Sequence, residues 1–186
     1  MSEGTIEGTA AAVHLSGEHH FSKEAVASIQ LLAGIGVDGD AHAGPTVRHR
    51  SRVAADPNQP NLRQVHLVES ELFDFVGRAG FEVRPGDLGE NITTSGIELL
   101  ELPVGSVLSI GTDGVLLCLT GARNPCGQIN GFSEGLLAEV KRRGPDGSPL
   151  RQVGPMAVVI SGGRVAPGDD ISVSLPPPPH VPLTRI

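Results

Sequence analysis

The sequence predicts a mainly β protein built from many short strands. Its 186 residues include 25 Gly and 15 Pro, scattered at turn positions along the chain rather than gathered in one low-complexity block. Short apolar stretches with β-branched members alternate with small or polar residues, as half-buried strands do. A chain of this length can bury one sizeable core. We therefore expect a single domain over residues 1–175, followed by a Pro-rich tail over residues 176–186.

The N-terminal third predicts strands joined by one elaborate loop. Apolar alternation indicates an antiparallel pair over residues 5–15 and 25–32, with a polar loop over 16–23 at the rim. The segment GIGVDGDAHAGP over residues 34–45 holds four glycines and a proline, which predicts a tightly folded loop without regular structure. A strand over residues 63–68, with Val65 and Leu67 facing inward, is expected to lead into a helix over residues 69–80.

The remaining segments predict a hairpin, another strand and a second helix. Strands over residues 104–110 and 115–120 flank the turn GTDG, and a further strand covers residues 155–161. A cap at Ser133, spaced leucines and a basic end indicate a helix up to Arg143. Pro-Gly-Asp occurs twice, at residues 85–87 and 167–169, and predicts a tight turn with an acceptor side chain. The tail is expected to be extended polyproline, packed on the domain or on a neighbouring subunit.

Charge and composition exclude several classes of partner. A net charge of -7 opposes long-range attraction to nucleic acid or anionic lipid. The 3% aromatic content, with no Trp or Tyr, removes the stacking platforms of single-strand binders. No apolar segment approaches the roughly 20 residues that span a bilayer, and no signal-peptide pattern is present. We expect a cytoplasmic protein without nucleic-acid or membrane partners, in which any anion site is local.

The two cysteines differ in their surroundings. Cys118 lies inside the apolar run VLLCLT, where a cysteine usually acts as a small buried hydrophobe. Cys126 lies in GARNPCGQ, just after a predicted strand, on a loop that would present its thiol. Only the thiolate is nucleophilic or ligates soft metals, and Arg123 or the amides of Gly127 and Gln128 could stabilise it. A structural cysteine in a turn remains the alternative.

A basic segment over residues 48–66 stands out on this acidic chain. It contains Arg48, Arg50 and Arg52, followed by Arg63 and His66. Because Arg forms planar bidentate pairs with phosphate, the segment indicates a site for one phosphorylated small molecule. A solvated loop paired with surface acids such as Glu69 and Glu71 is an equally good interpretation.

Two further loops carry polar groups. In GDAHAG, His42 together with Asp38 and Asp40 has the ligand types of a metal site, although a hydrogen-bonded structural histidine is the commoner case. The segment GDLGENIT over residues 86–93 offers glycines for close backbone approach and polar side chains for a heterocycle. It lacks the Lys-Ser/Thr pair of a Walker loop, so nucleotide binding of that type is not supported.

Taken in order, four segments of the chain resemble the MOSC domain, the module at the C-terminus of molybdenum cofactor sulfurases. They are GVDGDAHAG, LRQVHLV, PGDLGENITTSGIELLELPVGSVLSIG and LTGARNPCGQIN, which together span nearly the whole chain. The resemblance implies a strongly twisted, closed β-barrel of the pyruvate-kinase-barrel type with a few short helices. Ala122 and Pro155 depart from the residues expected there, which bears on packing more than on chemistry.

The resemblance also implies roles for individual residues. The cysteine matched by Cys126 carries persulfide sulfur or ligates molybdenum of a pterin cofactor, and Arg123 belongs to its motif. The candidate cofactor-binding residues are His42, Arg48, Arg50, Arg63, His66, Gly89, Glu90, Asn91, Thr120 and Asn124.

The expected function follows from that family. The chain would bind the molybdenum cofactor through Cys126 and reduce N-hydroxylated bases or amines, with electrons from a separate flavin or iron-sulfur protein. A persulfide carrier without turnover is the alternative, and a non-catalytic barrel that binds a partner through its tail is a second alternative. Pyridoxal phosphate is not expected, since it belongs to fused desulfurase domains and the only lysines here are Lys23 and Lys141. A homodimer is a further option.

Overall fold

The core of the molecule is a closed barrel of seven strands, seen in a computed structural model that describes residues 6–48, 53–54, 56–142, 144 and 153–186. The strands follow the order β11-β7-β8-β9-β5-β6-β1, and pairing of β1 with β11 closes the ring. This confirms the mainly β, closed-barrel fold. The barrel strands are β1 (Ile6–Leu15), β5 (Val65–Glu69), β6 (Ile92–Ser95), β7 (Val107–Ile110), β8 (Val115–Ala122), β9 (Pro155–Ser161) and β11 (Asp170–Ser174).

The long first strand makes the closure possible. Residues 6–9 of β1 pair with β11, whereas residues 9–13 pair with β6, so one strand joins both edges of the sheet. A bulge between Ala10 and Ala12 lies where the pairing changes, and such bulges bend a strand and increase its twist. All barrel pairs are antiparallel except β5 with β6.

Two expectations for the N-terminal third were wrong in detail. The strand expected over residues 25–32 is two strands, β2 (Glu24–Val26) on β1 and β3 (Ile29–Leu32) in a separate small sheet. That sheet also contains β10 (Gly163–Val165) and β4 (Gly36–Val37). The loop over residues 34–45 therefore includes a short strand, because Gly36 and Val37 pair with the end of β3.

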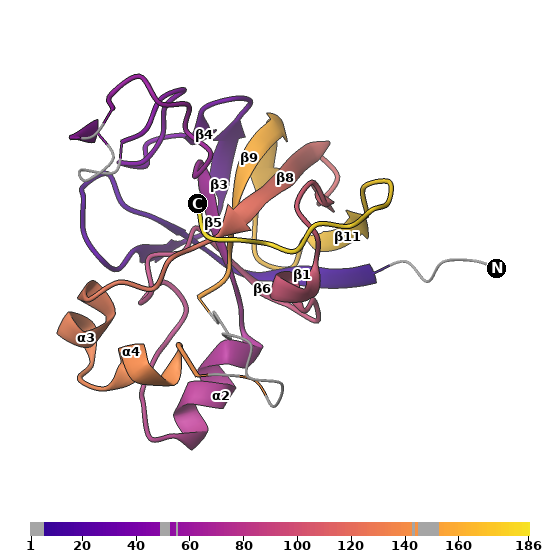
Figure 1. Ribbon diagram of the computed structural model, residues 1–186. Coiled ribbons are helices and arrows are strands. Elements are labelled where there is room, and N and C mark those ends of the chain that lie inside the picture. The colour runs from indigo at the N-terminus through magenta and orange to yellow at the C-terminus, as the bar shows by residue number, and fades with distance from the viewer. Residues whose placement is uncertain (1–5, 49–52, 55, 143, 145–152) are drawn as a thin grey trace.

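Three short helices lie together on one side of the barrel (Figure 1). They are α2 (Glu71–Arg78), α3 (Gln128–Phe132) and α4 (Leu136–Glu139), with a 3-10 turn η1 (Leu99–Glu101) elsewhere. A second apolar cluster, which includes Val68, Leu72 and Ile129, packs between the helices and the barrel.

The second helix expected from the sequence was misplaced. Helix α2 confirms the one expected over residues 69–80, with tighter ends. Within residues 133–143, where one helix was expected, the helix α4 is confined to Leu136–Glu139. Helix α3, which precedes it, was not predicted. Gly135, with φ of 87°, precedes α4 in a left-handed conformation, so the helix does not begin at Ser133. Arg143 lies outside the described residues.

The inward direction expected for Val65 and Leu67 is confirmed, since both belong to the barrel core, but the opposite face of β5 is buried as well. Val65, His66, Leu67 and Val68 are all buried, because the barrel core covers one face of this strand and other elements cover the second. Gln64 is buried too, and its amide bonds Gly34 O at 2.9 Å and the Val159 amide at 2.9 Å. Because both polar atoms of the Gln64 side-chain amide are hydrogen-bonded to backbone groups, burying this side chain costs little free energy.

The two Pro-Gly-Asp segments do share one turn chemistry. The Arg84 amide donates to Asp87 Oδ2 at 2.8 Å, and the Ala166 amide donates to Asp169 Oδ2 at 2.8 Å. The second turn connects β10 to β11, as expected of a strand corner. The first instead lies between α2 and β6.

The C-terminal tail packs on the barrel (Figure 1). The Val104 amide donates to Val181 O at 2.8 Å, and the Ala122 amide donates to Thr184 O at 2.8 Å. The tail thus ends beside the last residue of β8. No helix in the described ranges is long and apolar enough to cross a membrane.

Candidate functional site

A cavity of about 420 Å³ brings together most of the residues predicted from the sequence. Its lining combines the loops around residues 19–23 and 42–48, the start of β5, the loop before β6 and the loop after β8. Nine of the predicted site residues line it: His42, Arg48, Arg63, His66, Gly89, Asn91, Arg123, Asn124 and Cys126. Segments far apart in the sequence therefore meet at one end of the barrel.

Two of the other predicted residues, Glu90 and Thr120, are not among those that line the cavity. Arg50 lies outside the described residues. Glu90 is fully buried, with Oε1 accepting from the Gly86 amide at 2.6 Å. The Thr120 hydroxyl lies within hydrogen-bond distance of the backbone oxygens of Leu62 and Met156, at 2.6 and 3.0 Å.

Cys126 occupies the loop between β8 and α3. Its side chain is partly exposed to the cavity, and Sγ lies 3.4 Å from Gln128 Oε1. Cys118 is also half-buried rather than fully buried as expected, and burial raises the pKa of its thiol. Strand β8 carries Cys118 within the barrel wall, so Cys126 is the cysteine that the fold presents to the cavity.

Arg123 is held in a fixed position beside Cys126. Its Nη1 donates to Leu88 O and lies 3.3 Å from His66 Nδ1. Its guanidinium also lies over the Phe21 ring, 5.8 Å from the ring centroid, within cation–π range. Burial lowers the pKa of Arg123 from its ordinary value, while the charges of Cys126 and Glu90 oppose that shift.

The partners of His66 determine its protonation state. Nε2 lies 2.6 Å from Val153 O, which can only accept, so this nitrogen carries the proton. Nδ1 must then accept from Arg123, whose guanidinium can only donate. Burial, together with the charge of Arg123, places the pKa of His66 well below its ordinary value. His66 is therefore a neutral group that orients Arg123.

A buried ion pair supports the opposite wall. Lys23 Nζ lies 2.5 Å from Asp40 Oδ2, and the two side chains are 4% and 2% exposed. Asp40 Oδ1 also accepts from the His42 amide at 2.9 Å and contacts His42 Nδ1 at 3.2 Å. Burial alone would raise the pKa of Asp40, but the bonds to His42 and the charge of Lys23 lower it below its usual range.

Asn91 connects the two walls. Its Nδ2 donates to Asp40 Oδ2 at 2.9 Å, and its Oδ1 accepts from the His66 amide at 3.2 Å. A continuous polar network therefore runs from Lys23 through Asp40, Asn91 and His66 to Arg123. Such networks fix side-chain positions when every member is paired.

The sequence did not predict the Lys23–Asp40 ion pair or the place of Phe21 in the cavity lining. Lys23 and Asp40 are 17 positions apart, so no local spacing indicates that they meet. Asp40 was considered only as a metal ligand with Asp38 and His42, yet Asp38 is exposed and does not line the cavity. Within the described ranges, no group of three or more His, Cys, Asp or Glu side chains could hold a metal ion. Phe21 lay in a loop with no distinguishing pattern.

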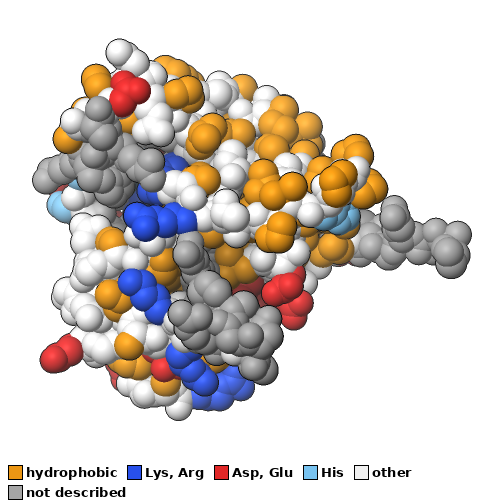
Figure 2. Space-filling view, in the orientation of Figure 1, with side chains coloured by type: hydrophobic (Ala, Val, Ile, Leu, Met, Phe, Trp, Pro, Cys, Tyr) orange, Lys and Arg blue, Asp and Glu red, His pale blue; other side chains and the backbone are white. Residues whose placement is uncertain are grey.

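Positive charge dominates the cavity. Arg48, Arg63, Arg123 and Arg185 all line it, on a chain whose net charge is -7. In Figure 2, Lys and Arg side chains follow a line from the barrel half to the helical half of the face shown. Guanidinium groups bind phosphate and carboxylate in planar geometry. Fold and site together define a β-barrel protein with a thiol-bearing cavity lined by arginines.

Comparison with protein families identifies the class more closely. The family model of the MOSC domain matches residues 17–172, so the chain belongs to the MOSC domain family. This family is associated with binding of the molybdenum cofactor. No curated protein matches the sequence.

Solved structures share the fold. The YuaD protein from Bacillus subtilis superimposes with a TM-score of 0.76 at 22% identity, covering 91% of this chain and 97% of that one. YiiM from Geobacillus stearothermophilus gives a TM-score of 0.65 at 16% identity, covering 94% of this chain and 79% of its own. YiiM from Escherichia coli gives 0.61 at 19% identity, with coverage of 94% and 73%.

Proposed function

We propose that the protein binds the molybdenum cofactor in the Cys126 cavity and reduces N-hydroxylated bases or amines. The observation that carries this proposal is the placement of one loop thiol in a cavity lined by four arginines. A thiolate is a soft ligand of the kind that molybdenum accepts. The arginines supply the charge that the phosphate of a pterin cofactor requires.

The cavity suits a group of this kind. Its volume of about 420 Å³ falls within the range of roughly 300–1,000 Å³ typical of ligand pockets. A metal held mainly by a pterin needs one protein donor rather than a cluster, and no cluster of three occurs in the described part of the chain. The thiol of Cys126 is the donor that the cavity offers.

Each lining residue then has a defined task. Cys126 ligates the metal, while Arg48 and Arg63 bind the phosphate group. His66 holds the Arg123 guanidinium in place on the loop that carries the thiol. When bound, the cofactor supplies two-electron oxygen-transfer chemistry, with electrons delivered by a separate flavin or iron-sulfur protein.

Metal and pterin analysis tests the proposal. Protein purified from cofactor-producing cells is expected to contain molybdenum and pterin in equal molar amounts. Cys126→Ser should lose the metal, whereas the matched variant Cys118→Ser should retain it, because Cys118 does not line the cavity. Retention of molybdenum by Cys126→Ser would contradict the ligand assignment.

The same samples identify the alternative function. A persulfide carrier needs no metal, so wild-type protein would contain cyanide-labile sulfur and neither molybdenum nor pterin. Loss of that sulfur in Cys126→Ser, but not in Cys118→Ser, would replace the reductase with a sulfur carrier that uses the same thiol.

A further inference from the structure

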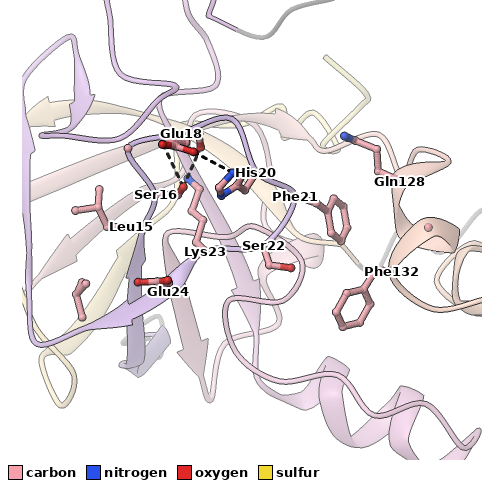
Figure 3. Close-up of a pocket in the computed structure, with 13 residues that line it drawn as sticks. Leu15, Ser16, Glu18, His20, Phe21, Ser22, Lys23, Glu24, Gln128 and Phe132 are labelled. Carbon is pink, nitrogen blue, oxygen red and sulfur yellow. Dashed lines mark hydrogen bonds and ion pairs between the residues drawn. The ribbon is translucent and has the colours of Figure 1, made fainter.

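An open groove of about 910 Å³ adjoins the Cys126 cavity. One side consists of the end of β1, the loop after it and the start of β2, and the other side consists of α3 (Figure 3). Groove and cavity share His20, Phe21, Lys23 and Gln128. A molecule in the groove would therefore lie directly beside the contents of the cavity.

Two phenylalanines, one from each side of the groove, lie close together in its lining. Phe21 and Phe132 lie next to each other in Figure 3, with ring centroids 6.0 Å apart and planes inclined by 38°. Phe132 remains 37% exposed, so part of its ring surface is available for contact with a molecule in the groove. Phe21 also packs under Arg123, so it forms the partition between the two compartments.

The charges of the groove are opposite to those of the cavity. Glu18 and Glu24 are exposed on the side formed by the loop after β1 and the start of β2, and Glu18 contacts His20 at 3.1 Å (Figure 3). The ammonium of Lys23 does not offset them, because it is buried against Asp40 at 2.5 Å. None of the four arginines that line the cavity lines the groove.

We propose that this groove binds the ring of a flat, positively charged aromatic molecule and presents it to the Cys126 cavity. Aromatic side chains favour a flat ring by offset or edge packing. The two carboxylates favour a cation and repel an anion, whereas the arginines of the cavity favour an anion. The assignment of this molecule as the substrate rests on the proposed function. The prediction that the groove binds it does not depend on that function.

A matched pair of probes tests the groove alone. The bicyclic 4-aminoquinoline is positively charged at neutral pH, whereas quinoline-4-carboxylate has the same ring system and a negative charge. Titration of the protein without cofactor, followed by ligand fluorescence and by amide shifts of residues 15–24 and 128–132, should show binding of the cation in the groove. Equal binding of both probes, or shifts confined to the arginine-lined cavity, would overturn the proposal.

Variants on the groove surface separate its two features. Phe132→Leu should weaken binding of 4-aminoquinoline about threefold to tenfold, the worth of one aromatic contact. Glu18→Gln/Glu24→Gln should weaken it about fivefold in low salt, and less at high salt. Glu82→Gln, an exposed carboxylate outside the groove, is the matched control and should change nothing.

Failure of this proposal is distinct from failure of the proposed function. Cys126→Ser should bind 4-aminoquinoline as well as wild type, because Cys126 does not line the groove. If both the Phe132 variant and the double Glu variant bound 4-aminoquinoline with unchanged affinity, the groove would not be its binding site, even in a protein that contains molybdenum. Selective binding of 4-aminoquinoline by a protein that never contains molybdenum would support the groove proposal and contradict the proposed reductase function.

Discussion

The ion pair between Lys23 and Asp40 is the residue-scale feature on which the cavity wall depends. Replacing Lys23 with Met keeps the length of the side chain but leaves the Asp40 carboxylate, only 2% exposed, without its cation. Breaking a buried pair in this way costs about 3–5 kcal/mol. Lys23→Met should therefore lower the free energy of unfolding by that amount, measured by urea denaturation.

The double variant Lys23→Met/Asp40→Asn is the control for that change. It removes the uncompensated charge while keeping an oxygen acceptor for the His42 amide, so it should recover part of the lost stability. If the double variant were less stable than Lys23→Met, the penalty would not come from an unpaired Asp40.

His14 predicts a dependence of stability on pH. Its ring is fully buried, and among the described residues neither ring nitrogen has a hydrogen-bond partner. Burial together with the charge of Lys23 lowers its pKa from 6.5 to about 4. The unfolded chain therefore binds more protons between these pH values, and this group destabilises the protein as pH falls below 6.5. Each pH unit costs about 1.4 kcal/mol.

Comparison with His14→Leu isolates this contribution. The difference in unfolding free energy, variant minus wild type, should become more favourable by about 2 kcal/mol between pH 6.5 and pH 5. His66 and Asp40 titrate in both proteins and cancel in the difference. A difference independent of pH would show that His14 does not stay neutral in the folded protein.

At this scale the sequence predicted the residues that share a motif and missed those joined only by the fold. Arg123 and Cys126 are three positions apart on one loop, so local chemistry sufficed to pair them. Lys23 and Asp40 meet through a bond between separate loops, and only the folded chain reveals it. His14 gave no signal because its neighbours in the sequence resemble those of any strand.

At the scale of elements, the loop before β6 is fixed by its contact with the loop that carries Phe21. Gly89 has φ of +79°, and a Cβ there would lie 2.3 Å from Phe21 O. Gly80 also has positive φ, at +91°, but a Cβ there would meet open space. Both alanine variants carry the backbone strain of about 1–3 kcal/mol, and only Gly89→Ala adds a collision.

Gly89→Ala should therefore destabilise the protein by about 2 kcal/mol more than Gly80→Ala. Urea midpoints of the two variants measure this difference. Equal midpoints would mean that the two loops separate easily and that the position of Phe21 is not set by Gly89.

Elements were predicted best where backbone pairing agrees with local pattern. The hairpin of β7 and β8 follows from two apolar strands and a GTDG turn, and both strands pair in full register. The division of residues 24–32 into β2 and β3 depends on tertiary structure instead, because each half pairs with a different sheet. The start of α4 depends on the left-handed Gly135, which sequence alone leaves open.

On the scale of the whole molecule, the order of the strands could not be read from composition. Alternation and turn residues predict strands, and the resemblance implied a closed barrel, but neither specifies that β1 pairs with both β6 and β11. Non-local pairing of this kind is decided by burial of the shared core. The same closure brings four loops and the start of β5 to one end, which explains why residues predicted separately meet in one cavity.

The C-terminal tail packs on this barrel, and its removal tests whether it contributes to the stability of the folded protein. Truncation after Leu175 removes Val181 O and Thr184 O, which accept from the Val104 and Ala122 amides, and uncovers Gly121, which lies beside Ile186. Loss of these bonds and apolar contacts should lower the unfolding free energy by about 3 kcal/mol. If the protein functions as proposed, truncation should also lower its molybdenum content, because the segment before Cys126 loses its support. Arg185→Gln, which removes only the tail's charge from the cavity, should keep wild-type stability in the same urea titration. Full stability of the truncated protein would show instead that the tail contributes charge to the cavity and nothing to the barrel.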